Sequence, residues 1–322
     1  MQMITEFGRM ADGRAVEAID LRGALLVRLL TLGSALQDVR VQGVAQGLTL
    51  GLPTLADYQA PGGQWFGTLV GPVANRLAGA AAPLGDRILR LAPNEGPNLL
   101  HSGPGGLHGR LWRIEDHLED RVTLALHLAD GEDGFPGNRR ITARWTVAAP
   151  ATLRLELRAE TDAPTLFNAA NHSYWNLDGT PSWAGHGLRI AATGWLPTGA
   201  DLLPTGAVAP MAGAMDFRSP RTPLPGDPPL DTNFCLAPAR RDLTPVLWLT
   251  GRSGLRMELA TTEPGVQVYD GRGAIRPGGG PCEGLAIEPQ GWPDAPNRAG
   301  FPSIRLDPGL PALQVTEWRF SR

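Results

Sequence analysis

Two residues suited to proton transfer stand far apart in this 322-residue sequence. His172 lies in the stretch NAANHSYWNLDG at 168–179, between asparagines and aromatic residues, and Glu288 lies in AIEPQGWPDAPN at 286–297. A carboxylate is ionised at neutral pH, and a histidine with a reference pKa of about 6.5 can be tuned to either protonation state. The two can serve as base and acid if the fold brings them to one substrate.

Other polar side chains occur in short clusters that could line the same site. They are amides, a guanidinium, a carboxylate and a second imidazole: Asn75, Arg76, His101, Asp231, Asn233 and Gln267. Amides and carboxylates bind hydroxyl groups, and tryptophan faces pack on the C–H side of a sugar ring, so the set suits acid–base work on an uncharged polyhydroxylated substrate. Each residue alone has a plainer explanation, since a lone histidine is more often a hydrogen-bonded structural residue.

Signatures of several other chemistries are missing from the sequence. There is no GxSxG nucleophile motif, no P-loop and no glycine-rich dinucleotide fingerprint after a predicted strand. Cys235 and Cys282 show neither CxxC nor Cys/His metal spacing, so the sequence predicts two free thiols rather than a disulfide framework or a zinc site. We expect an activity that needs no metal and no other cofactor.

The charge pattern limits the partners. The net charge is −3, and the basic residues are scattered, so we expect neither a nucleic acid nor a membrane as partner. No run approaches the ~18 apolar residues of a membrane-spanning helix, and the first residues are too polar for a signal peptide. A small neutral ligand, a cytoplasmic location and a monomer or homodimer are the expectations.

The elements that must position these residues are predicted to be β-strands. Apolar and polar residues alternate with period two over 121–130, 139–149, 151–160, 186–198, 247–263 and 312–322. Gly, Pro, Asp and Asn fill the short connections between them, as expected where an antiparallel chain reverses. The apolar stretch 20–39 could pass for a helix, but its internal glycines favour strand, turn, strand.

No linker or internal repeat divides the pattern, so residues 1–322 are predicted to form one domain. The proline-dense segment 219–230 is predicted to be an ordered surface loop. An all-β chain of this size favours a large antiparallel β-sandwich, with a closed barrel as the alternative. We expect His172 to lie on a strand of its concave face, with Tyr174 on the same side because side chains alternate.

The polar clusters, taken together, resemble the aldose 1-epimerase family, also called the galactose mutarotase family. The resemblance covers nearly the whole chain and consists of eight ordered segments: GPVANRLAG at 71–79, NEGPNLLHSGPGGLHGRLW at 94–112, GEDGFPGN at 131–138, NHSYWNLDG at 171–179, MDFRSP at 215–220, DTNF at 231–234, EPGVQVYDG at 263–271 and EPQGWPDAPN at 288–297. It implies a galactose mutarotase-like supersandwich that interconverts α and β anomers of hexoses such as glucose and galactose.

The resemblance also implies roles for particular residues. Glu288 would be the general base and His172 the general acid, and the sugar would be held by Asn75, Arg76, His101, Asp231 and Gln267. The segment that contains Glu288 resembles the family's catalytic-glutamate loop. No metal or nucleotide is needed for this reaction.

Three positions depart from the family's usual pattern. Pro72 stands where the family often has Arg, Thr232 where it often has His, and Pro289 where it usually has Thr. These departures leave the acid and base intact but weaken any inference about the preferred sugar. Two alternatives stay open: a hexose-6-phosphate 1-epimerase, with Arg218, Arg272 or Arg298 meeting the phosphate, and a carbohydrate-binding sandwich without activity.

Overall fold

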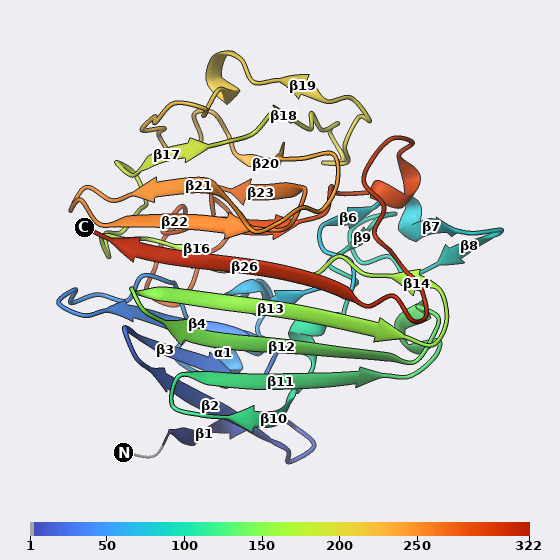
Figure 1. The fold of residues 1–322 in the computed structure, drawn as a ribbon, viewed down its shortest axis with the longest axis horizontal. Helices are drawn as coiled ribbons and strands as arrows, with labels where there is room; N and C mark the ends of the chain where they lie inside the picture. Colours follow the sequence, from blue (N-terminus) through green and yellow to red (C-terminus); the bar gives the residue numbers. More distant parts are fainter. Residues whose placement is uncertain (1–2) are drawn as a thin grey trace.

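The computed structural model describes residues 3–322, and almost all of its regular structure is antiparallel sheet (Figure 1). The largest sheet has eight strands, in the order β10 (Arg113–His117), β11 (Arg121–Leu128), β12 (Arg139–Ala148), β13 (Thr152–Thr161), β26 (Ala312–Ser321), β22 (Arg256–Thr261), β21 (Thr244–Thr250) and β17 (Gly187–Ile190). The last strand of the chain, β26, therefore lies inside this sheet, between β13 and β22.

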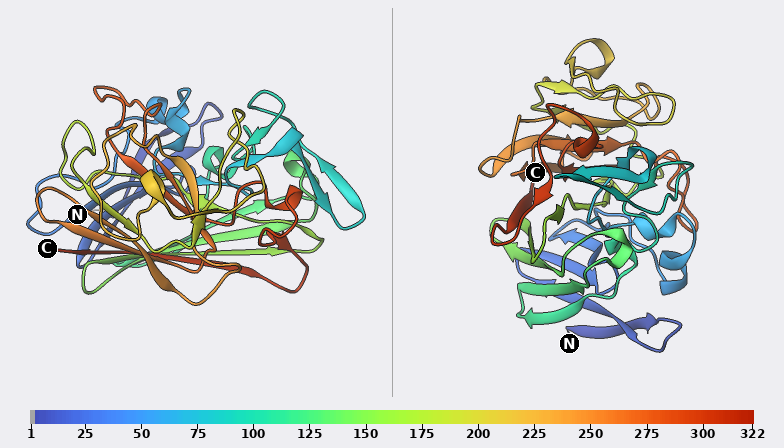
Figure 2. Two further views of the ribbon diagram at one scale, coloured as in Figure 1. Left: turned by 90° about the horizontal axis from the view of Figure 1, so that it is seen from above. Right: turned by 90° about the vertical axis from the view of Figure 1, so that its right-hand side faces the viewer.

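Two smaller sheets pack against the eight-stranded one. The first has six strands, in the order β16 (Tyr174–Trp175), β24 (Leu285–Gln290), β23 (Gly265–Tyr269), β20 (Asp231–Cys235), β18 (Gly194–Trp195) and β19 (Ala209–Pro210). The second contains β1 (Ile4–Arg9), β2 (Ala15–Arg22), β3 (Leu25–Leu30) and β4 (Ala35–Val41). The view from above separates the long strands of the eight-stranded sheet from the layer of shorter strands and loops that covers it (Figure 2).

The remaining elements are short. Four two-stranded pieces are formed by β5 (Leu69–Val70) with β15 (Ala170–Asn171), β6 (Arg76–Leu77) with β9 (Leu99–Leu100), β7 (Ala81–Leu84) with β8 (Arg87–Arg90), and β14 (Thr165–Leu166) with β25 (Arg305–Leu306). The helices are α1 (Leu55–Gln59) and the 3₁₀ turns η1 (Gly63–Trp65), η2 (Ala78–Ala80), η3 (Leu107–Gly109), η4 (Glu132–Gly134), η5 (Gly213–Met215) and η6 (Ala295–Asn297). Within residues 3–322, no helix has the length and apolar character to cross a bilayer.

One apolar core joins the three larger sheets. In β12, burial alternates along the strand, so Ile141 and Trp145 face inward and Arg144 faces solvent, which is the period-two pattern of a half-buried strand. The ring of Trp145 stacks on that of Trp318 in β26, with 6.0 Å between ring centroids, and its Nε1 donates to Ser34 Oγ at 2.9 Å. The inward faces of the sheets thus form a shared interior.

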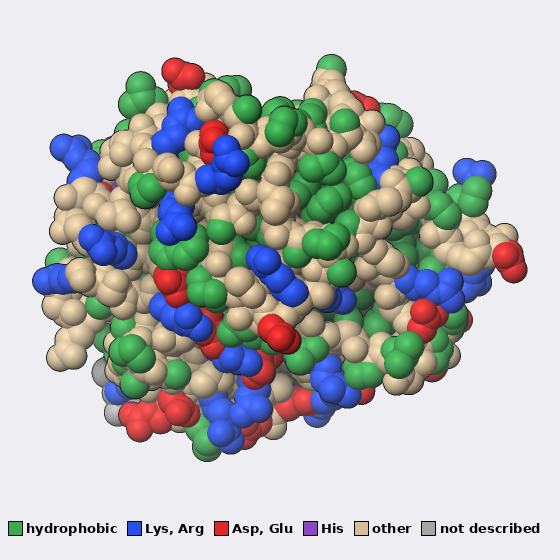
Figure 3. All heavy atoms as spheres, turned by 45° about the horizontal axis from the view of Figure 1, so that its top comes forward, with side chains coloured by type: hydrophobic (Ala, Val, Ile, Leu, Met, Phe, Trp, Pro, Cys, Tyr) green, Lys and Arg blue, Asp and Glu red, His purple; other side chains and the backbone are tan. Residues whose placement is uncertain are grey.

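The predicted fold class is confirmed: the chain is an all-β antiparallel sandwich. The segment 20–39 contains strands, as expected, and the proline-dense segment 219–230 is a loop. The expected strand at 186–198 divides into β17 and β18, which belong to different sheets. On the face drawn in Figure 3, acidic and basic side chains are intermixed, with no extended region of one sign.

Candidate active site

A cavity of about 420 Å³ opens beside the six-stranded sheet. It contains every residue to which the family resemblance gives a role except Gln267, whereas Asn233, the further polar candidate from the sequence, does not line it. The lining is Gly62, Trp65, Asn75, Arg76, Leu100, His101, His172, Tyr174, Leu202, Asp231, Tyr269, Arg272, Gly273, Ala274 and Glu288. Gln267 lies next to the cavity and is buried, and its Nε2 donates to Asp231 Oδ1 at 2.6 Å. Segments far apart in the sequence therefore meet at one place.

The sheet register places Glu288 at the cavity. In adjacent strands β20, β23 and β24, Asn233 pairs with Gln267 and Gln267 pairs with Glu288, so the three residues form a row across the sheet. Glu288 is 2% exposed. Glu288 lies within β24, whose hydrogen-bonded pairing continues to Gln290, so the segment that resembles the family's catalytic-glutamate loop begins on a strand, and a strand holds a side chain more firmly than a loop does.

His172 lies in the two-residue break between β15 and β16, so the prediction that a strand carries it is wrong. Its backbone is nevertheless fixed, because its N–H donates to Thr68 O at 2.9 Å and its carbonyl accepts from Gly67 N–H at 3.0 Å. Gly67 has φ +74°, and a Cβ there would lie 2.2 Å from Leu36 O, so only glycine fits this turn. Tyr174 lines the cavity beside His172, as expected.

The predicted acid and base face each other. His172 Nε2 lies 3.6 Å from Glu288 Oε1, and both side chains are almost fully buried. Burial lowers the pKa of His172 to about 4, and burial raises the pKa of Glu288 well above its usual value, with the Asp231 carboxylate raising it further and Arg76 opposing. These shifts favour a neutral imidazole beside a protonated carboxyl group, a pair that shares one mobile proton.

His101 is held in one tautomer by its neighbour. Its ring Nδ1 accepts the Asn75 backbone N–H at 3.1 Å, and the His101 backbone N–H donates to Asn75 O at 2.9 Å. Burial lowers the pKa of His101 well below its usual value, with smaller contributions from His172, His108 and Arg76. A neutral ring whose Nδ1 accepts must carry its proton on Nε2, so His101 is a hydrogen-bond donor at the cavity wall.

Among residues 3–322, the one group of side chains that could hold a metal ion is His101, His172 and Glu288, whose potential ligand atoms lie within 4.8 Å of one another. These residue types fit zinc, but each imidazole must offer a lone pair to the ion. The lone pair of His101 Nδ1 already accepts from Asn75, and the other nitrogen carries the proton. The residues therefore suit proton transfer and donation to a ligand better than metal coordination.

Arg76 is held by a partner that the sequence did not indicate. Its Nε and Nη2 donate to the two carboxylate oxygens of Glu95 at 2.6 and 2.8 Å, and its Nη1 lies 4.0 Å from Asp231 Oδ2. Such a bidentate pair fixes the plane of the guanidinium, and Nη1, which takes no part in it, remains near Asp231 at the cavity. Glu95 lies in the segment NEGPNLLH, but one acidic residue in a polar loop carries no signal of its own.

Trp65 is a further lining residue that the sequence did not assign to the site, and Arg272, which the sequence offered only for the phosphate of the hexose-6-phosphate alternative, also lines it. The Trp65 ring lies 4.8 Å from the His101 ring and 6.4 Å from the His172 ring, stacked on the latter. It therefore offers an aromatic face beside the acid–base pair, which suits the C–H side of a sugar. Pro72, Thr232 and Pro289, the three departures from the family pattern, are not among the lining residues.

Replacing His101 by alanine should raise KM and lower kcat together, because the lost donor leaves the substrate misplaced against the acid–base pair even though neither reacting group is altered. We expect a loss in kcat/KM of roughly 10- to 100-fold, measured by polarimetry of freshly dissolved α-glucose. His117→Ala, in β10 of the eight-stranded sheet, is the control and should change nothing. Unchanged kinetics in His101→Ala would leave His101 with a purely structural role.

A β-sandwich whose cleft holds a buried carboxylate and imidazole among neutral hydrogen-bonding groups defines the mutarotase class of isomerases. The chain belongs to the aldose 1-epimerase family, because the family described as "Aldose 1-epimerase" matches residues 18–317. It is accordingly an isomerase that exchanges sugar anomers.

Relatives and solved structures agree with this assignment. The chain is 34% identical to galactose mutarotase from Mus musculus over 98% of both chains, and 31% identical to aldose 1-epimerase from Escherichia coli K12 over 99% of both chains. An aldose epimerase homologue from C. elegans superposes with a TM-score of 0.88 at 28% identity, covering 96% of this chain and 99% of that one. Galactose 1-epimerase from Lactobacillus acidophilus gives 0.87 at 26% identity, covering 99% of this chain and 98% of that one.

Proposed function

We propose that the protein interconverts the α and β anomers of neutral hexoses such as glucose and galactose, with Glu288 as general base and His172 as general acid. The observation that supports these roles is the 3.6 Å approach of His172 Nε2 to Glu288 Oε1 in a hydroxyl-binding cavity. Polarimetry of freshly dissolved α-glucose and α-galactose tests the activity. A rate no faster than the spontaneous one for either sugar would refute it.

The reaction uses the single proton that the pair shares. When a sugar binds, that proton moves from Glu288 to His172, which produces a carboxylate and an imidazolium without any exchange with solvent. The Glu288 carboxylate removes the proton of the anomeric hydroxyl, the bond between C1 and the ring oxygen breaks, and His172 gives its proton to the ring oxygen. Rotation about C1–C2 and the reverse steps close the ring on the other face.

The remaining predicted residues would hold the sugar. Arg76, fixed by Glu95, and Asp231, fixed by Gln267, present a donor and an acceptor side by side. Asn75 lines the cavity and would in addition support its neighbours: its Oδ1 accepts from the Arg76 backbone N–H at 2.8 Å, and its backbone orients His101. Gln267 likewise supports Asp231, and we propose it as a positioning residue.

The pH profile should follow the shared proton. Below about pH 4, the pKa of His172, the pair carries two protons and has no base, so kcat/KM falls as pH decreases. At high pH the pair loses its only proton and has no acid, and because the pKa of Glu288 is raised, this loss occurs above the ordinary carboxyl range. We expect a plateau between these limits in background-corrected polarimetry. A main transition at the ordinary histidine value of about 6.5 would contradict the assigned proton count.

The hexose-6-phosphate alternative depends on Arg218, Arg272 and Arg298. Arg272 is the one of these three that lines the cavity. Its Nε and Nη2 donate to the fully buried carboxylate of Asp270 at 2.8 and 2.7 Å, and its Nη2 also donates to Leu230 O at 3.2 Å. A paired guanidinium attracts a dianion far less than a free one, and the cavity also contains the carboxyl groups of Asp231 and Glu288.

We therefore expect kcat/KM for glucose or galactose to exceed that for the corresponding 6-phosphate, and salt to have little effect on the neutral sugar, since screening acts on charge pairs. Polarimetry of both substrates at two ionic strengths measures this. Arg272→Gln should not abolish activity on the neutral sugar. A preference for the phosphate that Arg272→Gln removes would identify a sugar-phosphate epimerase instead.

The second alternative, a binding protein without activity, is not favoured by the site. A pure binder gains nothing from burying Glu288 next to His172, because the desolvation of two ionisable groups costs free energy. A cytoplasmic location, a single domain and a monomer or homodimer as the working form stay predictions from the sequence.

A further inference from the structure

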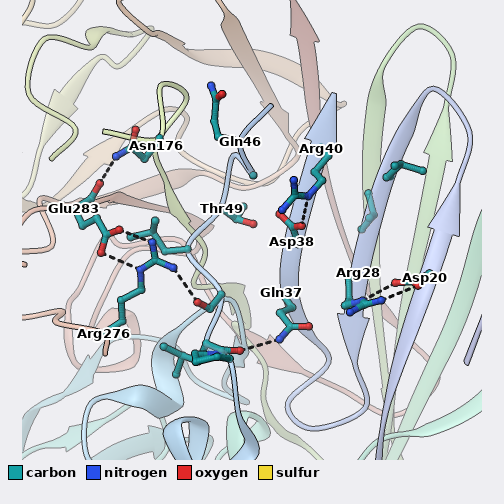
Figure 4. Close-up of a pocket in the computed structure, with 18 of the residues that line it drawn as sticks. Asp20, Arg28, Gln37, Asp38, Arg40, Gln46, Thr49, Asn176, Arg276 and Glu283 are labelled. Carbon is teal, nitrogen blue, oxygen red and sulfur yellow. Dashed lines mark hydrogen bonds and ion pairs between the residues drawn. The ribbon is translucent and has the colours of Figure 1, made fainter. Parts of the chain in front are cut away.

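A second and larger hollow lies away from the acid–base pair. It measures about 940 Å³, more than twice the catalytic cavity, and lies between strands β2 to β4 on one side and the β23–β24 loop on the other. In Figure 4, Asn176, Glu283 and Arg276 form one wall, and Asp38 and Arg40 belong to the opposite wall. We call this hollow the side groove. A volume of this order accommodates a ligand of several sugar rings.

Six of the seven charged side chains that line the side groove form three ion pairs, and Arg22 is the seventh. The guanidinium of Arg40 donates to Asp38 Oδ2 at 2.6 Å, and Arg276 Nε donates to Glu283 Oε2 at 2.9 Å. Arg28 and Asp20 form a third pair, which is bidentate. A polyanion would meet the carboxylates, and a cation would meet the guanidiniums, so neither suits this lining.

Neutral polar groups and apolar side chains complete the lining. The amide and hydroxyl side chains on the groove are Gln37, Gln46, Thr49, Asn176 and Thr180. Leu26, in β3, is 53% exposed, and Pro53 and Pro277 add apolar surface to the groove. Alternating donors and acceptors beside apolar patches match a sugar, which has hydroxyls on its edges and C–H groups on its faces.

Two polar side-chain atoms at the side groove have no hydrogen-bond partner among the described residues. They are Thr49 Oγ1 and Gln37 Oε1, although Gln37 Nε2 donates to Leu52 O at 2.8 Å. Thr49 is 7% exposed and lines the groove. Both atoms are closed to solvent, so a ligand hydroxyl or a water ordered by a ligand would reach them only after a side-chain rotation, and would then recover the free energy that an unpartnered buried polar atom costs.

We propose that the side groove is a second carbohydrate site, which binds a neutral oligosaccharide independently of the catalytic cavity. The β23–β24 loop separates the two sites: its residues Arg272 to Ala274 line the catalytic cavity, and Arg276 lines the groove. Arg276 also donates to Gly51 O at 3.2 Å across the groove, which fixes this part of the loop. The site therefore exists as a formed surface before a glycan arrives.

Calorimetric titration with the methyl glycosides of maltotriose, cellotriose and β-1,4-galactotriose tests this proposal. Galactose at saturating concentration fills the catalytic cavity throughout, and a methyl glycoside cannot mutarotate. We expect at least one trisaccharide to bind with one-to-one stoichiometry under these conditions. Absence of binding for all three, or displacement by galactose, would overturn the proposal whatever the outcome of the mutarotase assay.

Two pairs of variants assign the binding to the groove. Arg40→Ala should weaken trisaccharide binding about tenfold. Arg158→Ala is its control and should not change the binding, although Arg158 forms the same kind of exposed ion pair, at 2.6 Å, with Glu160 two residues further along β13. Thr49→Val should weaken it roughly three- to tenfold, whereas Thr165→Val removes an equally unpartnered buried hydroxyl elsewhere and should have no effect.

All four variants should keep normal mutarotase activity, because none of them lines the catalytic cavity. The proposal would also be overturned if Arg158→Ala weakened trisaccharide binding as much as Arg40→Ala, or Thr165→Val as much as Thr49→Val. Tighter binding of a sulfated trisaccharide than of the neutral ones would overturn it too.

Discussion

Glu288→Gln is expected to lower kcat for mutarotation by roughly 10²-fold or more, the usual contribution of a general acid–base group. Glutamine keeps the size of the side chain and much of its hydrogen bonding but has no basic oxygen to receive the proton of the anomeric hydroxyl. KM should change little, because the sugar-binding role that we propose for Arg76 and Asp231 does not depend on Glu288. Polarimetry of α-glucose at saturating concentration, corrected for the spontaneous rate, measures the loss.

A matched control separates chemistry from the removal of a buried carboxylate. Glu263 is also almost completely buried and interacts with Arg240 outside the cavity, and burial raises its pKa as it does that of Glu288. Glu263→Gln should leave kcat within a few-fold of the original when the rate is expressed per folded protein. Near-normal turnover of Glu288→Gln would show that another group is the base.

The second large effect concerns the acid. His172→Asn should reduce kcat by a similar factor while raising KM much less, because proton delivery to the ring oxygen is needed only as the ring opens. Asparagine preserves a neutral hydrogen-bonding side chain in the break between β15 and β16, where the backbone bonds to Thr68 and Gly67 do not depend on the imidazole. The same polarimetric assay, run over a range of sugar concentrations, separates the two parameters.

His127→Asn is the control for this substitution, because His127 is exposed on β11, which pairs with β12 in the eight-stranded sheet and does not line the cavity. It should have the original kcat and KM. If His172→Asn lost affinity but not turnover, the imidazole would be a binding group, and the proton for the ring oxygen would have to come from elsewhere.

The long strands were predictable from the sequence because their side chains alternate over many residues. The expected strands at 139–149 and 151–160 correspond to β12 and β13 within one residue at each end. Strands β5, β15 and β16 have only two residues each, too few to show a period, so the break that holds His172 was not predictable. The structure there is set by contacts from Gly67 and Thr68, about a hundred residues away.

The site was predictable where residue type and motif carry the chemistry. Glu288, His172, His101, Arg76 and Asp231 all line the cavity, as expected. The supporting contacts were not predictable, because they depend on which residues meet across the fold.

Three residues show this. Glu95 becomes a partner only when β6 and β9 bring its loop to Arg76, and Gln267 becomes a support for Asp231 only through the register of β20 and β23. Trp65 is one of nine tryptophans, and nothing in its neighbours along the chain distinguishes it from those that fill the core.

The position of β26 has a consequence for biosynthesis. This strand follows both of its neighbours in the chain, yet β13 and β22 pair with it inside the eight-stranded sheet. Until β26 has left the ribosome, β13 and β22 each present an open edge that can pair with another chain. The sheet is therefore completed only when β26 emerges, and the nascent chain depends until then on chaperones or on dilution to avoid aggregation.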